Sequence, residues 1–294
     1  MKRLRLNPTA LMVISMGVFG TISVFVRRIA LPSGEIAFFR ALLATVLVGG
    51  FLLVTGKRPT AGKGKRTLLL LLLSGFAMGI NWILLFEAYK YTTVSSATLA
   101  YYFAPVIVTV LCPIFFRERL SGMQILCFTM STVGLVLITG VGGTGENDVV
   151  GILLGLAAAC FYATVVLLNK CIKDVEGIHR TFFQFLSATV TLLPYVLFTG
   201  GFHLSALDAG GWGALFTVGI LHTGVTYCLY FSALRGLPGQ NAAILSYIDP
   251  LVAVLISVFW IGEGITPLEI VGGVMILGFS LLNELSMRKH VPKQ

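Results

Sequence analysis

The chain has 294 residues, of which 56% are hydrophobic and only 11% are charged, and its mean hydropathy is +0.93. So few charges cannot cover the surface of an ordinary water-soluble fold, which the composition therefore excludes. The net charge of +9 does not form one basic segment, because Lys and Arg fall in short gaps between apolar runs. This distribution indicates membrane topology and argues against a nucleic-acid partner.

Ten apolar runs are long enough to cross a bilayer, which takes about 20 mostly apolar residues. The runs are continuous and lack the alternation of membrane β-strands, so we expect helices with connections too short for a soluble domain. The first run follows Lys2, Arg3 and Arg5, but it lacks a signal-peptide cleavage motif and Arg27 follows it directly. We therefore expect it to be a retained span. The ten runs cover residues 9–26, 35–55, 68–89, 94–116, 121–141, 149–169, 181–200, 210–233, 239–260 and 266–285.

The basic residues also predict the orientation. With the N-terminus inside, 17 of the 21 Lys and Arg residues lie on the cytoplasmic side. Arg27, Arg28 and Lys90 remain outside, and Arg40 lies within the second run. The excess of inside charge predicts that both termini are cytoplasmic in a multi-pass protein of the cell membrane.

The sequence repeats itself after about half its length. Residues 38–46 (FFRALLATV) and 182–190 (FFQFLSATV) share six of nine residues at an offset of 144. Residues 86–118 return without a gap as residues 231–263, 145 positions later, and a mid-run Pro, a nearby Tyr and a terminal Glu stay in register. Such repeats define the architecture before any other signal. The identical pairs are Phe86/Phe231, Ala88/Ala233, Ala97/Ala242, Tyr102/Tyr247, Pro105/Pro250 and Glu118/Glu263.

The two repeats, 9–141 and 149–285, each hold five runs. Because five is odd, the second repeat is expected to enter the membrane with the opposite polarity. Inverted repeats of this kind are typical of secondary transporters, in which the substrate site lies near the bilayer midplane at the repeat interface.

The stretches PVIVTVLCPIFFRERL from Pro105 and PLVAVLISVFWIGEGI from Pro250, within two five-run halves, resemble the EamA family of the drug/metabolite transporter (DMT) superfamily. The resemblance implies a solute carrier, often an exporter of amino acids or other metabolites. It also implies a central cavity lined by the first, third and fourth helices of each half. The chain departs from a regular repeat where Gln184 stands opposite Arg40, and Asp249 opposite Ala104.

Asp249 is the strongest candidate for a functional residue. It lies in the middle of the run 239–260, where a charge costs roughly 2.5–3.5 kcal/mol on insertion scales. The following Pro250 removes a backbone hydrogen bond and opens the helix at the carbonyl group of Ser246. A carboxyl group at such an opening can bind a substrate amine or a proton. The alternative is a protonated Asp249 that hydrogen-bonds a neighbouring helix for packing alone.

His222 lies on a polar stripe with Gly219, Thr226 and Tyr230 at helical spacing. Such a stripe should face a cavity or another helix and not lipid. Histidine titrates near neutral pH, so proton coupling and a simple interhelical hydrogen bond both remain open.

Arg40 lies five residues into the run 35–55. It can attract a substrate carboxylate, but we favour a structural role in which it snorkels to the interface or pairs with Glu35 or Glu87. For Glu87 we expect a pair with Lys90, three residues further along the helix.

Aromatic rings with polar tips gather in the third and fourth runs. Asn81 and Trp82 lie in the middle of the third run, and Tyr101 and Tyr102 lie in the fourth, with Tyr247 as the repeat counterpart of Tyr102. Such rings suit a pocket for a partly apolar solute, although aromatic residues at this depth often serve packing only.

Two further features are expected to be structural. Glu118 and Glu263 end equivalent runs on opposite faces of the membrane, so substrate contact at both is not expected. Glycines at small-xxx-small spacing let helix backbones approach closely in lipid. These glycines are Gly75/Gly79 and Gly151/Gly155.

Motifs for cofactor or enzyme chemistry are missing from the sequence. The five cysteines form no CxxC pair and show no metal spacing, and neither a GxxxxGK[ST] phosphate loop nor an HExxH zinc motif occurs. Asp249 has no second intramembrane aspartate beside it, as an aspartyl protease would need. We therefore expect no cofactor and no enzymatic activity.

These features predict an all-α integral membrane protein of ten helices, a secondary transporter for the efflux of amino acids or related metabolites by alternating access. Its partners would be a small-molecule substrate and membrane lipids, and a homodimer is left open. A lipid-moving or regulatory membrane protein without solute transport is the alternative. The candidate substrate-binding residues are Asn81, Trp82, Tyr101, Tyr102, His222, Thr226, Tyr247 and Asp249.

Overall fold

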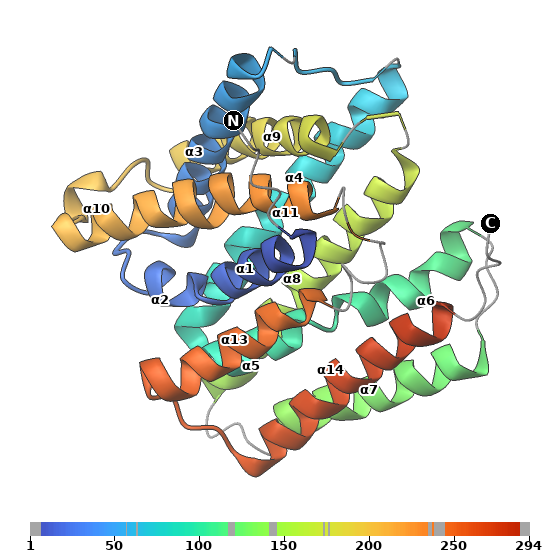
Figure 1. The fold of residues 1–294 in the computed structure, drawn as a ribbon. Helices are drawn as coiled ribbons and strands as arrows, with labels where there is room; N and C mark the ends of the chain where they lie inside the picture. The colour runs from blue at the N-terminus through green and yellow to red at the C-terminus, as the bar shows by residue number, and fades with distance from the viewer. Residues whose placement is uncertain are drawn as a thin grey trace.

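The computed structural model describes residues 7–56, 58–62, 64–116, 121–140, 146–172, 174–175, 177–234, 237 and 245–288. Throughout these ranges the chain forms helices joined by short connections, without a β-strand (Figure 1). The helices are α1 (Pro8–Gly20), α2 (Ile22–Val26), α3 (Ser33–Val54), α4 (Lys65–Tyr91), α5 (Val94–Tyr101), α6 (Ala104–Phe116), α7 (Gly122–Gly140), α8 (Glu146–Cys171), α9 (Gly177–Phe198), the 3-10 turn η1 (Leu204–Ala206), α10 (Ala209–Phe216), the π-helix η2 (Thr217–Val225), α11 (Thr226–Leu234), α13 (Ile248–Ile256), the π-helix η3 (Ser257–Ile261) and α14 (Pro267–Arg288).

Six helical stretches are long and apolar enough to cross a membrane, and four shorter apolar helices accompany them. Each coincides with one of the ten runs predicted from the sequence. The six long stretches are Pro8–Val26, Ser33–Val54, Lys65–Tyr91, Asp148–Cys171, Gly177–Phe198 and Ala209–Tyr230, and the shorter ones are Val94–Val108, Gly122–Leu137, Ile248–Ile261 and Pro267–Asn283.

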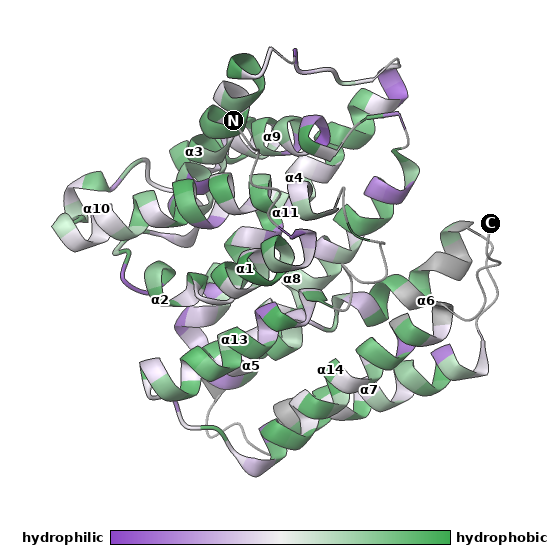
Figure 2. Cartoon of the chain, viewed as in Figure 1, coloured by the Kyte–Doolittle hydropathy of each residue, from purple (hydrophilic) through white to green (hydrophobic). Residues whose placement is uncertain are grey.

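The outside of the helix bundle is apolar, as a surface in contact with lipid must be. Figure 2 shows hydrophobic residues along nearly all of the helices. Large apolar side chains are exposed, among them Val54 and Phe198, each at 90%, and Trp260 at 76%. Aromatic side chains near helix ends, such as Trp260, are typical of the membrane interface.

Several of the runs that we expected to be continuous helices are interrupted. The first run breaks at Thr21 between α1 and α2, and the fourth breaks at Tyr102 between α5 and α6. The eighth run is helical throughout but changes to π-helical geometry over η2. The hydrophobicity of a segment indicates that it crosses the membrane. It does not indicate where the helix breaks, because the breaks depend on single residues and on the neighbouring helices.

The helices pack in pairs that the sequence repeat relates to one another. In one pair, α4 packs against α8. In the equivalent pair, α11 takes the place of α4 and α1 takes the place of α8, and these two helices also pack together. α3 packs against its own counterpart α9, and α7 lies beside its counterpart α14 (Figure 1). The hydroxyl groups of Thr45 and Thr189 lie 3.3 Å apart across the α3–α9 contact, and these residues are separated by 144 positions, the offset of the repeat.

Close packing of α4 against α9 depends on a glycine. A Cβ atom on Gly75 would lie 2.5 Å from the Cβ of Ser187 and would also collide with the backbone carbonyl of Gln184. Backbone atoms cannot move aside as a flexible side chain can, so this contact tolerates no side chain at position 75. The close packing predicted from the small-xxx-small spacing is therefore confirmed at Gly75.

We expect Gly75→Ala to destabilise the protein by about 1–3 kcal/mol, because it overpacks a helix interface that is already in contact. Gly50→Ala in α3 is the matched control, since nothing lies within 4 Å of a Cβ at that position. Thermal unfolding of both purified variants in detergent tests this, and an equal midpoint for the two would contradict it.

Candidate functional site

The candidate site lies where the broken helices of the two repeats meet. Tyr102 ends α5, and after a short break α6 begins with Ala104 and Pro105. In the second repeat, Tyr247 precedes α13, whose first turn holds Asp249 and Pro250. Proline lacks a backbone N–H and is tolerated in a first helical turn, so each proline favours a new helix start at its position. Asp249 gains from this arrangement, because the N-terminus of a helix stabilises a carboxylate.

Tyr102 and Asp249 connect the two repeats directly. The Tyr102 hydroxyl group donates a hydrogen bond of 2.5 Å to Oδ2 of Asp249. A hydrogen bond from a hydroxyl to a carboxylate is among the stronger ones in proteins. The structure therefore gives Asp249 a protein partner and places it at the repeat interface.

Arg40, for which the sequence favoured a structural role over contact with a substrate carboxylate, lies buried beside aromatic rings. The side chain is 5% exposed, and its Nε donates a hydrogen bond of 2.8 Å to the hydroxyl of Thr223 in η2. Its guanidinium carbon lies 4.3 Å from the ring centre of Trp82 and 5.5 Å from that of Phe86. A cation held over aromatic faces in this way gains electrostatic energy in place of hydration.

The expected pairing of Arg40 with Glu35 or Glu87 is wrong. The Glu35 carboxylate accepts the backbone N–H of His203 at 2.9 Å and lies 2.6 Å from that residue's imidazole Nδ1. Glu87 accepts hydrogen bonds from Ser33 and from Lys90, so the predicted Glu87–Lys90 pair is confirmed at 2.9 Å. Both acids thus have other partners, and Arg40 is left with a neutral hydroxyl.

The π-helix η2 positions Thr223 for this contact. The hydroxyl of Thr223 donates to the carbonyl of Val218, five residues back, as the wide π-helical turn allows. Thr226 donates in the same way to the carbonyl of Leu221. Single π-helical turns inside α-helices occur frequently at functional sites. Here η2 directs polar side chains toward α3 and α2.

Arg40 and Asp249 carry opposite charges but do not touch. Among the described residues no hydrogen bond or ion pair joins them, and each side chain has another partner, Thr223 for Arg40 and Tyr102 for Asp249. Aromatic contacts continue around them. Ring centres are 5.7 Å apart for Tyr101 and Tyr102, 5.8 Å for Trp82 and Phe185, and 5.2 Å for Phe185 and Tyr227.

The other predicted site residues make contacts between helices or within one helix. Asn81 is buried and donates to the carbonyl of Ala158 in α8 at 2.7 Å. His222 is 1% exposed, and its Nε2 lies 2.9 Å from the hydroxyl of Thr21. Tyr247 is 9% exposed and stands directly before α13. Asn81 and His222 therefore tie elements of opposite repeats together around the Arg40–Asp249 region.

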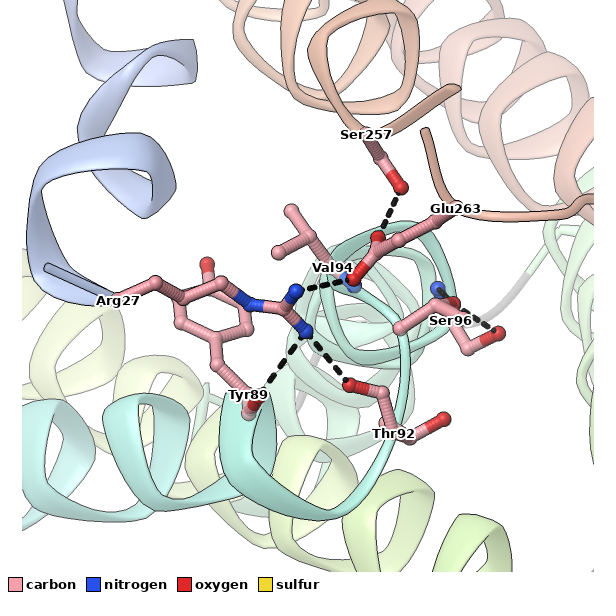
Figure 3. A network of polar contacts seen from close by, with 8 residues as sticks. Arg27, Tyr89, Thr92, Val94, Ser96, Ser257 and Glu263 are labelled. Carbon is pink, nitrogen blue, oxygen red and sulfur yellow. Dashed lines mark hydrogen bonds and ion pairs between the residues drawn. The ribbon is translucent and has the colours of Figure 1, made fainter. Parts of the chain in front are cut away.

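A second polar network joins the ends of α2 and α4 to the start of α5 and to the segment after η3 (Figure 3). Arg27, at the end of α2, forms an ion pair of 2.6 Å with Glu263 and donates to the carbonyls of Tyr89 and Thr92. Glu263 also accepts the backbone N–H of Val94, which opens α5, and the hydroxyl of Ser257. Its structural role, predicted from the sequence, is confirmed, whereas Glu118 lies outside the described residues.

Gly262 allows the side chain of Glu263 to point back toward its partners in this network. It ends η3 in the left-handed conformation, with φ of +76°. Glycine adopts this conformation without a steric cost, so it turns the chain sharply and directs the next residue back toward the helix. Because the basic residues predict that this end of the bundle faces outward, we call it the outer end.

No group of three or more metal-ligating side chains occurs in the part of the chain that the structure describes. Charged side chains where interrupted apolar helices meet are typical of membrane transporters. The comparisons with known proteins name the family. The chain belongs to the EamA-like transporter family, whose model matches residues 8–140 and 149–284.

Two relatives support this assignment, and one solved structure shares the fold. The chain is 35% identical to the uncharacterized transporter YxxF of Bacillus subtilis (strain 168), over 90% of this chain and 85% of the relative. It is 30% identical to an uncharacterized transporter of Archaeoglobus fulgidus, over 93% and 94% of the two chains. A crystal structure at 18% identity shares the fold, with a TM-score of 0.64 over 96% of this chain and 98% of the other.

The Tyr102–Asp249 contact can be measured by a double-mutant cycle with Tyr102→Phe, Asp249→Asn and the double variant. We expect a coupling energy of at least about 0.5 kcal/mol in thermal unfolding, because residues in direct contact are coupled by about 0.5–3 kcal/mol. A cycle of Tyr102→Phe with Asp148→Asn, a carboxylate at the start of α8, is the control. Strictly additive effects for Tyr102 and Asp249 would contradict the contact.

Proposed function

We propose that the protein is a secondary transporter that exports small zwitterionic metabolites, such as amino acids, across the cell membrane by alternating access. One observation carries the proposal. Arg40 is buried in the first repeat and Asp249 is partly buried in the second, their side chains carry opposite charges, and among the described residues no ion pair joins them. A zwitterion bound between them would meet an opposite charge at each of its ends.

Arg40 is suited to hold the carboxylate of the solute. Burial of a guanidinium is costly unless hydrogen bonds and an opposite charge offset it, and Arg40 has only a hydroxyl and aromatic faces as the contacts described for it. Arginine binds a carboxylate through two parallel hydrogen bonds, which a lysine cannot match. A solute carboxylate would therefore supply the partner that the protein lacks here.

Asp249 is suited to hold the amino group. Its Oδ2 accepts the hydroxyl of Tyr102, and a carboxylate has further acceptor positions for an ammonium group. The rings of Trp82, Tyr101 and Tyr227 then offer apolar surface for the side chain of the solute. His222, Thr226, Asn81 and Tyr247 would complete the site as residues that hold its walls or reach the solute as the helices move.

Alternating access by two inverted repeats is part of the same proposal. It is supported by the paired packing of α4 with α8 and α11 with α1, and by the contact of Thr45 with its repeat counterpart Thr189. It is also supported by helix breaks at Tyr102 and ahead of α13, because transporters of this kind build their sites from interrupted helices. Two five-helix units, 9–141 and 149–285, would rock against each other around the site.

Counterflow in proteoliposomes tests the function with a panel of labelled amino acids, sugars and nucleosides. We expect saturable exchange of an amino acid, and weak exchange of its analogues that lack the amino or the carboxyl group. Arg40→Gln and Asp249→Asn should each raise the half-saturation concentration at least 30-fold, since loss of one buried charged partner costs about 2–5 kcal/mol. Arg66→Gln, an exposed residue at the other end of the bundle, is the control.

The matched analogues make this test specific. Asp249→Asn should remove the preference for solutes with an amino group but keep the preference for a carboxylate, and Arg40→Gln should do the reverse. If both variants lose both preferences equally, the two charges do not read separate ends of the solute. If folded protein exchanges no member of the panel, a lipid-moving protein becomes the better proposal, and lipid scrambling in the same vesicles is measured next.

A pH gradient across the same vesicles tests whether Asp249 carries a coupling proton. If it does, the gradient should stimulate uptake by the wild-type protein and should leave the residual uptake by Asp249→Asn unchanged. His222→Gln separates the second titratable candidate. Stimulation that persists in Asp249→Asn but disappears in His222→Gln would move the proton to His222.

A further inference from the structure

A cavity of about 280 Å³ lies at the outer end of the first repeat. Aliphatic side chains, including Ile29 and Ile36, form one part of its wall, and Phe86 with Arg27 and Lys90 form the rest, beside Tyr89. Its volume lies just below the range of about 300–1,000 Å³ that is typical of ligand pockets. It therefore suits a solute smaller than a drug molecule.

Both charged side chains that line the cavity are cations, each held by an acid outside the lining, Arg27 by Glu263 and Lys90 by Glu87, with which a solute carboxylate would have to compete. The side chains of Arg27 and Lys90 are 32% and 47% exposed, so both remain accessible from the outer end. The remaining wall is apolar and aromatic. This combination fits an organic carboxylate with an apolar body, and it disfavours an amine without a carboxylate.

We propose that this cavity is a second binding site, for the carboxylate of such a solute, and that the bound carboxylate competes with Glu263 for Arg27. The proposal rests on the proposed function only in taking the ligand to be the transported solute. Nothing in the transport proposal itself requires a site at this position.

The cost of this competition is limited because Glu263 has other partners. When Arg27 turns to the solute, Glu263 keeps the backbone N–H of Val94 and the hydroxyl of Ser257 (Figure 3). Its carboxylate is thus not left buried without hydrogen bonds, which would be the main cost of breaking the pair. Arg27 in turn keeps its contacts with the carbonyls of Tyr89 and Thr92.

The exchange would also loosen the outer end of the bundle. The Arg27–Glu263 pair connects the end of α2 with the connection that follows η3, and thus joins the two repeats. Phe86 lines the cavity, and its ring centre lies 5.5 Å from the guanidinium carbon of Arg40. One aromatic side chain therefore separates this outer site from the central candidate site.

Cysteine modification tests the site directly. The five native cysteines are replaced by serine, and Ile29→Cys is introduced in the cavity. We expect the anionic reagent MTSES to react at least about tenfold faster than the cationic MTSET, relative to a control Cys at the exposed Ser205 of the same outer end. Phenylacetate should protect Ile29→Cys with a saturable dependence on concentration, and phenethylamine, its cationic counterpart, should not.

Two variants assign the effect. Arg27→Gln and Lys90→Gln should each lower the MTSES preference and weaken the protection by phenylacetate several-fold. Lys90→Gln leaves the Arg27–Glu263 pair intact, so it remains informative if Arg27→Gln does not fold. Equal reaction rates for the two reagents, or equal protection by phenylacetate and phenethylamine, would overturn the proposal. Protection of Ile29→Cys by phenylacetate without solute counterflow would support this outer site and count against the transport proposal. Solute counterflow without such protection would support transport and count against the outer site.

Discussion

The hydrocarbon core of a bilayer offers no hydrogen bonds, so every polar group of this chain at that depth must find its partner within the protein. This requirement makes the apolar runs helical. It also confines the interruptions at Tyr102, ahead of α13 and in η2 to surfaces that other helices cover. A charged side chain is costly at this depth. Arg40 is stabilised by a threonine hydroxyl and aromatic rings, and Asp249 by a tyrosine hydroxyl. The position and the chemistry of the candidate site thus both follow from the absence of hydrogen-bonding partners in the bilayer core.

Most of the fold was predictable because membrane insertion depends on summed hydrophobicity. Within the described residues, apolar helices occur in all ten runs, and equivalent helices of the two repeats pack in equivalent ways. The breaks were not predictable, because a π-helical turn such as η2 changes hydrogen bonding by one residue without changing hydropathy. Only the prolines gave a warning, and they mark the new helix starts after Tyr102 and Tyr247.

The candidate site was predictable only in part. Asp249 stood out because it is a lone carboxyl group in the middle of an apolar run, whereas its hydrogen bond to Tyr102 was not predicted. The pairing expected for Arg40 with Glu35 or Glu87 was wrong, because both acids have other partners. Their true partners, His203, Ser33 and Lys90, depend on loops and helix contacts that no local pattern encodes. The informative signal was the departure from the repeat, where the second half carries Gln184.

Two guanidinium groups at different depths would let one solute carboxylate move by exchange. Arg27 already has Glu263 as a partner, so a carboxylate gains less there than at Arg40, whose described hydrogen bond is to a neutral hydroxyl. A carrier must bind its solute strongly enough to select it and weakly enough to release it. If the protein exports such a solute, the step from Arg40 to Arg27 would be unfavourable for the solute alone, and the step from Arg27 to water would be helped because Glu263 recovers its ion pair. Re-formation of that pair would close the outer end as the solute leaves, which links release to closure without a separate energy source.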